Sequence, residues 1–500
     1  MENKNILIIG GGLGGLMTAI ILQKNNYNVT IVEKNTRVGG LLQSFKRKGC
    51  TFDTGMHYIG SLDDGQVINK FFKYFNILDK LSLKRMDAQQ YDVFKIGDNT
   101  YKYPFGWDAF YKQMLKYFPD EQQAIKAYVE KVKEVSKSHD LYNLRYPIDE
   151  SMTQSPALEQ GIFQYIKSIT NNTELQNVLL ASNSLYAGKK DKASLYMHAV
   201  IHNYYNNSAY KILGGGEKVA QAFANEFEKL GGKIIVNEEI VKLEVEGKEV
   251  INAISKTGNA FQFDHFISNV HPSLTMKMIG DKYLRKSYKR RLENQNNTIS
   301  TFNIHVKLNK DIMPNMNYTF YRYKSGKVWA VDQCDIETWP QDYIIYTPAY
   351  HKDKAYSSCF SVLTYMNYEE VKQWENSTHS NRPKEYLEWK KQMTNRILEV
   401  MEKDFPGLTD SIESIESLSP LSYKNYVNNV AGEMYGIEHD FNKPLYSRVF
   451  PNTKLENLYL TGQNVNMHGM LGVALASLLS VKSFVSINDL MEEINPENDL

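Results

Sequence analysis

Two short runs of hydrophobic residues near the N-terminus flank a glycine-rich turn. Residues 5–9 (NILII) and 29–32 (VTIV) are predominantly apolar, as expected for strands that are covered on both faces of a parallel sheet. Between them, residues 16–22 have the character of a helix, which ends before the asparagines at 25–26. The pattern therefore predicts a strand, helix, strand unit at the start of the chain.

The apolar stretch 6–22 also has features of a signal peptide or a membrane anchor. It contains five glycines, it is shorter than the roughly 20 residues that a membrane span needs, and no basic segment or small-residue cleavage site flanks it. We therefore interpret it as part of a folded domain.

Three glycines of the turn have the spacing G-x-G-x-x-G. In this motif Gly10 permits the tight turn, Gly12 lets a pyrophosphate approach the backbone, and Gly15 allows helix and strand to pack closely. The N-terminus of the helix offers free N–H groups to the diphosphate. Glu33 ends the second strand, where a carboxylate can accept hydrogen bonds from a ribose and would repel a 2′-phosphate. These features predict dinucleotide binding.

Further along the chain, the pattern predicts a helix over 217–230, strands over 231–236 and 239–243, and a strand at 458–460 before an apolar helix that begins at 469. A second glycine cluster at 214–216 lacks the G-x-G-x-x-G spacing, and no acidic residue ends the following strand. We therefore do not expect a second nucleotide site there.

Composition narrows the class of protein. The chain has 500 residues, 42% of them hydrophobic, and 58 Lys and Arg against 57 Asp and Glu. This balance is typical of a globular protein of several domains and provides no field that would attract nucleic acid. Three distant cysteines at 50, 334 and 359 form neither a redox pair nor a metal knuckle, so we expect reduced thiols, a cytoplasmic protein and no metal.

Three segments resemble a known family. The run from Glu33 to Gly40 continues the fingerprint as E-x-x-x-R-x-G-G, and it is similar to that of the flavoprotein superfamily of amine oxidases and phytoene desaturases. Residues 52–60, FDTGMHYIG, resemble the branch of retinol saturases and carotenoid isomerases. Residues 458–464 and 469–474 resemble the C-terminal FAD motif of the same superfamily, in which a helix N-terminus faces the flavin.

The resemblance implies FAD as the cofactor. The superfamily usually has an Asp where Gln463 and Asn464 stand, which leaves individual hydrogen bonds at this position open. The residues expected to bind FAD are Gly10, Gly12, Leu13, Gly14, Gly15, Glu33, Lys34, Arg37, Gly39, Gly40, Leu41, Ile240, Gly462, Gln463, Asn464, Gly472 and Val473.

The expected fold class is α/β, with a discontinuous Rossmann-like FAD-binding domain (parallel sheet, βαβ) and an inserted α+β substrate domain. We expect the FAD-binding domain to comprise 1–80, 206–292 and 446–490, and the substrate domain a helical segment 81–205 and a mixed segment 293–445. Residues 491–500 are expected to be an acidic, solvated tail.

Aromatic residues point to the substrate. They make up 12% of the chain, and several, among them Tyr321 and Tyr346, alternate along expected strands of the substrate domain. With the family resemblance, they favour an apolar polyene or isoprenoid. Motif position puts His57, Tyr58 and His468 near the flavin, and we take them as the candidate catalytic residues.

The expected activity is saturation or desaturation of a carbon–carbon double bond by hydride transfer at flavin N5, with NAD(P)H open as the external electron donor. Redox-neutral cis–trans isomerisation, amine oxidation and a non-catalytic lipid-binding scaffold like the GDP-dissociation inhibitors are the alternatives. A lipid substrate would favour peripheral association with the inner face of a membrane. We expect no protein partner.

Overall fold

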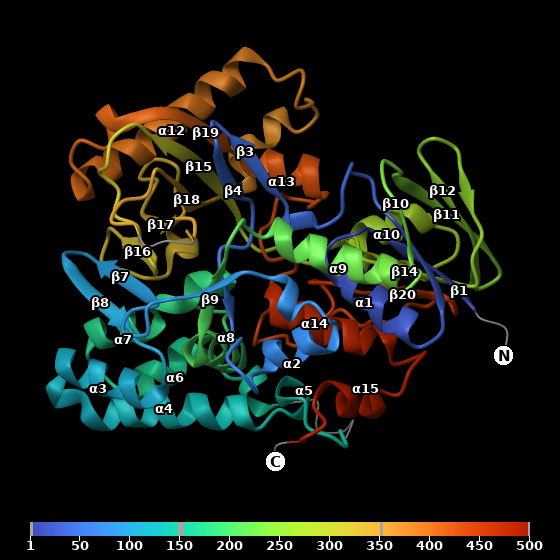
Figure 1. The fold of residues 1–500 in the computed structure, drawn as a ribbon, viewed down its shortest axis with the longest axis horizontal. Coiled ribbons are helices and arrows are strands. Elements are labelled where there is room, and N and C mark those ends of the chain that lie inside the picture. The colour runs from blue at the N-terminus through green and yellow to red at the C-terminus, as the bar shows by residue number, and fades with distance from the viewer. Residues whose placement is uncertain (1–3, 149–154, 351–353, 499–500) are drawn as a thin grey trace.

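The computed structural model describes residues 4–148, 155–350 and 354–498, and a parallel sheet lies at one end of it (Figure 1). The sheet has five strands in the order β10 (Lys233–Ile235), β2 (Asn28–Val32), β1 (Asn5–Ile9), β14 (His265–Ser268) and β20 (Leu458–Leu460). All four pairings are parallel. Its strands come from three distant parts of the chain, which confirms the predicted discontinuous α/β sheet.

Helix α1 (Leu13–Lys24) connects β1 to β2, as the hydrophobic pattern predicts. It packs against α14 (Gly469–Val481) and α9 (Glu217–Lys229), and its residues from Gly14 to Leu22 are buried all round. Burial on every side explains why this segment is as apolar as a membrane anchor. Within the described ranges, no helix is both long and apolar enough to cross a bilayer.

A seven-stranded sheet forms the second layer. Its order is β19 (Ile412–Leu418), β15 (Ser300–Leu308), β18 (Cys359–Met366), β17 (Asp342–Tyr346), β16 (Thr319–Tyr323), β7 (Asp92–Ile96) and β8 (Asn99–Tyr103). Helix α12 (Lys384–Asp404) covers one face, where Ile397 and Met401 join Phe302 and Ile304 in one cluster. Alternate residues, including Tyr321, Tyr323 and Tyr365, face the larger core that borders the parallel sheet.

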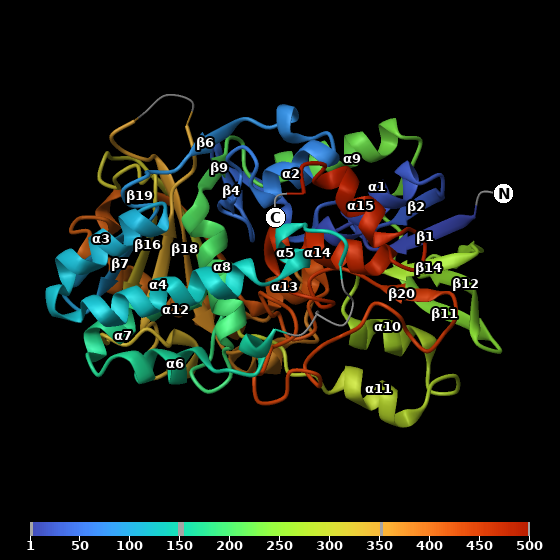
Figure 2. The same cartoon turned by 90° about the horizontal axis from the view of Figure 1, so that it is seen from below.

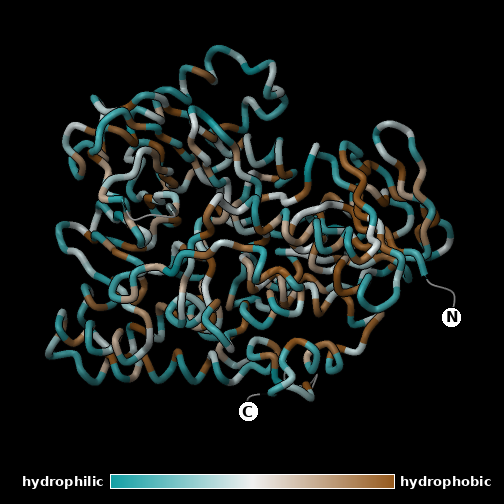
Figure 3. Tube along the Cα trace, viewed as in Figure 1, coloured by the Kyte–Doolittle hydropathy of each residue, from teal (hydrophilic) through white to brown (hydrophobic). Residues whose placement is uncertain are grey.

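A helical layer covers the other side of this core (Figure 2). In Figure 3 the long helix α4, along the lower edge, is mostly hydrophilic, in keeping with its place on the surface. The layer consists of α3 (Trp107–Tyr117), α4 (Gln122–Lys137), α5 (Asp140–Asn143), α6 (Ile162–Ile169), α7 (Thr173–Leu180) and α8 (Leu195–Asn207). The expected helical segment 81–205 therefore needs a correction, because its first part forms β6 (Leu83–Arg85), β7 and β8. Strands β6 and β7 pair with β9 and β16, which lie far along the chain, and local periodicity does not reveal such partners.

Smaller elements connect the layers. The hairpin of β3 (Ser44–Arg47) and β4 (Cys50–Asp53) lies beside β18, and β9 (Ala209–Ile212) pairs with both β5 (Ile59–Gly60) and β6. A separate antiparallel sheet contains β11 (Ile240–Glu246), β12 (Glu249–Ser255) and β13 (Ala260–Phe261). The remaining α-helices of the described residues are α2 (Val67–Tyr74), α10 (Pro272–Ile279), α11 (Lys286–Glu293), α13 (Pro420–Val427) and α15 (Ile487–Ile494).

The predicted acidic tail is wrong over its first residues. Met491 and Ile494 lie on the buried face of α15, which packs on α2 and α14. Asn495 is also buried, and its side chain accepts a hydrogen bond from Lys70 at 2.8 Å. An apolar spacing of three to four residues within the acidic run places the carboxylates on the outer face. Residues 499–500 of the tail lie outside the described ranges.

Candidate flavin and substrate site

The turn between β1 and α1 has open space beside Gly12 and is tightly packed at Gly15. A Cβ at Gly12 would meet only the Asn269 side chain, at 3.1 Å, whereas a Cβ at Gly15 would lie 2.2 Å from the Gly10 carbonyl oxygen. Gly10 itself has a φ of +98°. No side chain caps the N-terminus of α1, so its N–H groups are available to an anion. The turn has the shape that a pyrophosphate requires.

Glu33 follows β2 and is fixed by the backbone. Its carboxylate accepts hydrogen bonds from the N–H of Gly11 at 2.8 Å and of Asn35 at 2.9 Å. The side chain is only 6% exposed, yet it lines the cavity described below. A carboxylate oxygen accepts more than one hydrogen bond, so Glu33 can bind a ribose hydroxyl while it keeps its backbone contacts.

A cavity of about 280 Å³ runs from this turn to the interface with the seven-stranded sheet. Most of the residues that the sequence predicts to bind FAD or to act in catalysis line this cavity. They come from segments as distant as 9–14 and 463–473. Those lining it are Gly10, Gly12, Leu13, Gly14, Glu33, Lys34, Gly39, Gly40, Leu41, His57, Tyr58, Ile240, Gln463, Asn464, His468 and Val473.

Four expected cofactor residues do not line the cavity. Arg37 forms an ion pair with Glu217 and donates to the Ser44 carbonyl at 2.9 Å, so the structure directs its guanidinium away from the expected diphosphate. Gly15, Gly462 and Gly472 instead allow close packing. A Cβ at Gly462 would lie 2.3 Å from Asn269 Oδ1, and one at Gly472 would lie 2.3 Å from the Met467 carbonyl oxygen.

Two other expected residues hold the walls of the cavity together. Lys34 Nζ donates to the Asn425 carbonyl at 3.0 Å, and burial lowers the pKa of its ammonium. Asn464 Oδ1 accepts the N–H of Ile437 at 3.0 Å. The superfamily usually has an Asp at this position. In this chain the Asn464 side chain binds the backbone of the loop at Ile437.

The glycine cluster 214–216 is not a phosphate cradle. Asp53 Oδ1 accepts the N–H of Gly216 at 2.7 Å, and Ser44 Oγ accepts the N–H of Glu217 at 3.3 Å. A Cβ at Gly215 would lie 2.5 Å from the same Asp53 oxygen. Protein side chains therefore already occupy the N-terminus of α9, which agrees with the prediction of no second nucleotide site.

The far end of the cavity is aromatic. The His57 ring stacks on the Tyr346 ring with centroids 3.7 Å apart. Tyr58 shares a hydrogen bond with Tyr321, their hydroxyl oxygens 2.8 Å apart, and donates to Asp92 at 3.4 Å. Further aromatic or apolar side chains that line this end are Leu185, Tyr204, Tyr205, Met434, Tyr435 and Met470.

Burial keeps the polar groups at this end uncharged. It lowers the pKa of His57 to about 3, with smaller contributions from His305 and Lys211, and it lowers the pKa of His468 to about 4. Burial also raises the pKa of Asp92 well above its usual value, because desolvation disfavours the ionised form of this carboxyl group. Neutral imidazoles at pH 7 are hydrogen-bonding groups and not proton reservoirs.

His468 is held in place by two contacts. Its Nε2 donates to the Leu185 carbonyl at 3.1 Å, and its ring lies against Tyr435 with centroids 4.3 Å apart. It is the residue directly before α14, and its side chain forms no capping hydrogen bond with that helix. These contacts leave little freedom for the ring to move.

Sequence reasoning missed several residues of the site. Asp92 and the pair Tyr204 and Tyr205 carry no motif. The one available signal for Asp92 was an acidic residue directly before the apolar run of β7. Tyr321 and Tyr346 belong to the aromatic strands that composition had indicated.

Comparisons with known proteins identify the family of this chain. The family of flavin containing amine oxidoreductases matches residues 13–477. The chain belongs to this family and is therefore a flavin-dependent oxidoreductase. The glycine turn, the fixed carboxylate of Glu33 and the open N-terminus of α1 fit FAD, because they match its pyrophosphate and ribose.

Curated relatives point to polyene chemistry. The chain is 25% identical to all-trans-retinol 13,14-reductase of Danio rerio, over 95% of this chain and 85% of the relative. The human protein of the same name is also 25% identical, with 97% and 86% covered. Prolycopene isomerase 1 from an Oncidium hybrid is 21% identical, with 96% and 83% covered.

Solved structures share the fold. An oxidoreductase from Methanosarcina mazei superposes with a TM-score of 0.63 at 16% identity, covering 96% of this chain and 100% of that chain. A putrescine oxidase bound to putrescine has the same TM-score at 12% identity, covering 98% and 99%. These likenesses confirm the fold of the family.

Proposed function

We propose that this protein is an FAD-dependent oxidoreductase that saturates or desaturates a carbon–carbon double bond of an apolar polyene or isoprenoid of the carotenoid or retinoid type. The observation that carries the proposal is the uncharged, aromatic end of the cavity. The four ionisable carboxylates and ammonium groups that line the cavity are Glu33, Lys34, Glu238 and Glu239, all near the carboxyl ends of β2 and β10. The relatives named as retinol reductases support the same substrate class.

We propose that the parallel sheet and the seven-stranded sheet belong to different functional parts of the chain. We assign cofactor binding to 1–80, 206–292 and 446–490, which supply the strands of the parallel sheet. We assign substrate binding to 81–205 and 293–445, which supply the seven-stranded sheet and the helical layer. The cavity lies between them and receives residues from both.

Adding two hydrogens across a double bond requires a hydride on one carbon and a proton on its neighbour. FAD, when bound, exchanges a hydride at N5. We assign delivery of the proton to the hydroxyl of Tyr58, a residue that lines the cavity. As Tyr58 gives up its proton, hydrogen bonds from the Tyr321 hydroxyl and from the carboxyl group of Asp92 in its protonated form would stabilise the phenolate, and a proton from solvent would restore the phenol before the next turnover.

We assign His57 and His468 to positioning. His57 stacks on Tyr346 and His468 contacts Tyr435, so both rings shape the aromatic wall against which an extended polyene would lie. Their low pKa values leave them neutral, which suits a wall that excludes water and charge from an apolar substrate.

The electron donor in saturation is proposed to be NAD(P)H, acting from outside. A donor without its own Rossmann site would have to reach the flavin through the substrate end of the cavity. Mixing the reduced nicotinamide with the oxidised protein under anaerobic conditions tests this assignment: bleaching of the flavin bands supports it, and unchanged bands exclude it.

One experiment separates the main candidates. The purified flavoprotein is reduced anaerobically with dithionite, the excess is removed, and all-trans-retinol or lycopene is added while absorbance is recorded. Return of the oxidised flavin bands with formation of a dihydro product supports saturation. Bands that stay reduced while the polyene changes geometry support isomerisation, the alternative favoured by the prolycopene isomerase relatives.

Two further outcomes would overturn the proposal. Protein that binds polyene but never retains flavin would be a lipid-binding scaffold, and peroxide formed with amines would mark an amine oxidase. Peripheral membrane association, which we propose from the apolar substrate, is tested by flotation with liposomes of anionic and neutral lipids. Protein that stays at the bottom of the gradient with both would exclude it.

A further inference from the structure

Exposed hydrophobic residues gather on one loop. Nine large hydrophobic residues in the described ranges are exposed, and three of them lie within six positions: Leu445 at 58%, Tyr446 at 49% and Phe450 at 47%. A single exposed hydrophobic residue is normal on a protein surface, but three on one short loop indicate contact with an apolar partner. We call these three residues the apolar tip.

The loop that carries the apolar tip rests on helix α11. Arg291 donates to the Arg448 carbonyl at 3.1 Å, and Gln295 donates to the Tyr446 carbonyl at 2.7 Å. The Lys454 ammonium lies 5.9 Å from the centroid of the Tyr288 ring. In Figure 2, α11 lies at the lower edge of the molecule. The apolar tip and α11 therefore belong to one surface of the protein.

This surface is rich in cations, although the whole chain has a net charge of only +1. The cations of α11 and the residues just before it are Lys282, Arg285, Lys286, Lys289, Arg290 and Arg291, and the loop adds Lys443, Arg448 and Lys454. Of these nine, only Lys289 has a carboxylate within 4.0 Å among the described residues. The positive charge is therefore largely left without an internal counterion.

Most carboxylates near this surface have other partners. Asp281 and Glu293 pair with Lys289, and Glu456 pairs with Lys248 at 3.5 Å. Asp440 Oδ1 accepts the backbone and side-chain N–H groups of Asn442 at 2.9 and 2.8 Å. Glu159 lies exposed near the loop. One exposed carboxylate against eight cations leaves a clear excess of positive charge, which an anionic partner would complement.

Cations and aromatic rings are interleaved on this surface. The Arg448 guanidinium lies 5.4 Å from the centroid of the exposed Phe450 ring, and the Lys282 ammonium lies 5.6 Å from that of Tyr283, which is 38% exposed. Lys286 and Arg290 are both exposed and, four residues apart on α11, share one face of the helix. Rings beside cations are typical of the interface between water and lipid, where the rings lie among the head groups and the cations meet phosphates.

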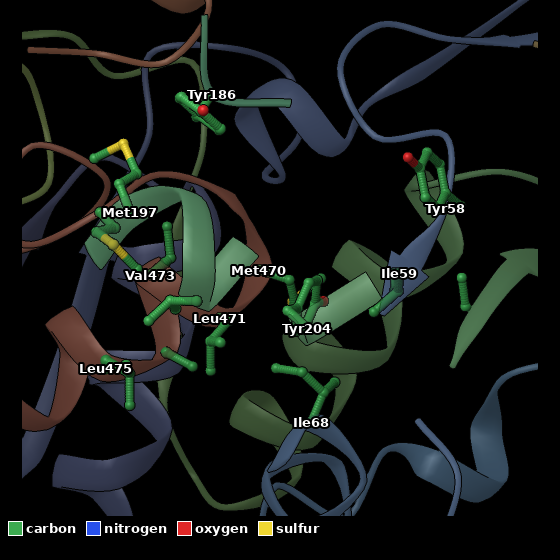
Figure 4. Packing of buried hydrophobic residues seen from close by; sticks show 14 of the residues in the cluster. Tyr58, Ile59, Ile68, Tyr186, Met197, Tyr204, Met470, Leu471, Val473 and Leu475 are labelled. Atoms are coloured by element: carbon green, nitrogen blue, oxygen red, sulfur yellow. The ribbon is translucent and has the colours of Figure 1, made fainter. Parts of the chain in front are cut away.

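Hydrophobic side chains continue from the apolar tip into the protein. Leu445 lines a small second cavity together with Met197 and Leu475. These two residues belong to the same buried hydrophobic cluster as Met470 and Val473, which line the flavin and substrate cavity (Figure 4). The apolar tip therefore adjoins an apolar region of the interior that extends to the proposed substrate site.

We propose that the apolar tip and α11 dock on a membrane surface that contains anionic lipids, with the tip at the boundary of the acyl chains and the cations on lipid phosphates. The charge alone would also suit nucleic acid, but the exposed Leu445 and Phe450 on the same surface favour lipid. The inference rests on the peripheral membrane association proposed above, and it names the surface and the lipid charge that this association requires.

The test is flotation of the FAD-loaded protein with vesicles of phosphatidylcholine, alone or with about 30% phosphatidylglycerol. We expect the wild-type protein to bind the anionic vesicles and to bind the neutral ones at least about tenfold more weakly. The double variant Lys286→Gln with Arg290→Gln should weaken binding to the anionic vesicles by about 10- to 30-fold. Lys112→Gln with Lys116→Gln, two exposed lysines at the same spacing on α3, is the matched control and should bind like wild type.

The apolar tip has a separate signature. Leu445→Ser should weaken binding to the anionic vesicles by about threefold to tenfold and leave the salt dependence unchanged, because the lost contact is apolar. Leu387→Ser, which removes a leucine of α12 that is 53% exposed, is the matched control and should have no effect. Added salt should weaken the binding of the wild-type protein more than that of the α11 double variant, since salt screens the charges that the variant lacks.

Several results would overturn the inference. If the α11 and Leu445 variants float as fully as the wild-type protein, the contact lies elsewhere, while peripheral association itself still stands. Equal binding of the wild-type protein to neutral and anionic vesicles would remove the role of the cations, and no binding to either would exclude peripheral association as well. A dimer that Leu445→Ser converts to a monomer in sedimentation would assign the apolar tip to a second copy of the chain. An oligonucleotide that binds in place of vesicles would assign α11 to nucleic acid.

Discussion

The Tyr58 hydroxyl lies 2.8 Å from the hydroxyl of Tyr321, a residue 263 positions away in the chain, and the pair is buried beside Asp92. Tyr58 arrives from the segment that follows the β3–β4 hairpin, and Tyr321 from the middle of the seven-stranded sheet. The two phenols thus join the cofactor side of the cavity to its substrate side, and they are the natural place to test the proposed proton transfer.

Tyr58→Phe should slow saturation of a polyene by about 10²- to 10⁴-fold, the usual contribution of a positioned acid, because the ring stays and only the proton is lost. The flavin content should not change. Turnover and single-turnover flavin reoxidation measure the effect. Tyr205→Phe, which removes another phenol from the same cavity, is the control, and equal losses in both variants would count against a specific role for Tyr58.

Asp92→Asn should make stability less dependent on pH. Burial raises the folded-state pKa of Asp92 well above its usual value of 3.8. The folded state then holds a proton that the unfolded state releases above about pH 4, so the stability this group contributes is complete below its unfolded pKa and falls as pH rises toward the folded pKa.

The asparagine has no such proton to lose. Urea unfolding at pH 5 and pH 7.5 should therefore show a smaller decline for Asp92→Asn than for wild type, while the exposed Asp98→Asn should behave like wild type. A steeper decline in the Asp92 variant would mean that the buried carboxyl is ionised.

His57→Phe should keep the reaction rate within a few fold, whereas His57→Ala should not. The phenyl ring preserves the stacking on Tyr346 at 3.7 Å, but alanine leaves a gap and should cost about 1–3 kcal/mol of stability. Because the pKa of His57 is lowered to about 3, the rate should show no step from this residue between pH 5 and 8. A step in that range that disappears in His57→Phe would restore an acid–base role.

Gly12→Ala and Gly15→Ala should fail in different ways. A methyl group at position 12 meets only Asn269 at 3.1 Å, so it should leave the apoprotein folded but block the pyrophosphate and weaken FAD binding by at least about tenfold. A methyl group at position 15 meets the Gly10 carbonyl at 2.2 Å and should destabilise the apoprotein by about 1–3 kcal/mol. Flavin titration and thermal unfolding of the apoproteins distinguish the two, and similar melting temperatures with similar FAD affinities would refute the difference.

Local spacing determined the cofactor half of this protein. The strand, the glycine turn, the helix and Glu33 lie within 29 residues, so the contacts that define them are short in sequence and their pattern is readable. The same holds for the strand β20 and the helix α14 near the C-terminus. Hydrophobic periodicity and turn chemistry are therefore enough to predict such elements from the sequence.

Which residues meet at the substrate end of the cavity depends on the tertiary structure. Asp92 becomes part of the site because β7 pairs with β16, more than 200 residues later, and local sequence does not encode that register. Arg37 pairs with Glu217 of α9 instead of pointing into the cavity. The acidic C-terminal run becomes a packed helix because α2 and α14 offer it an apolar surface. Burial then sets which groups are charged, since desolvation depends on every element packed around a side chain and not on its neighbours in sequence.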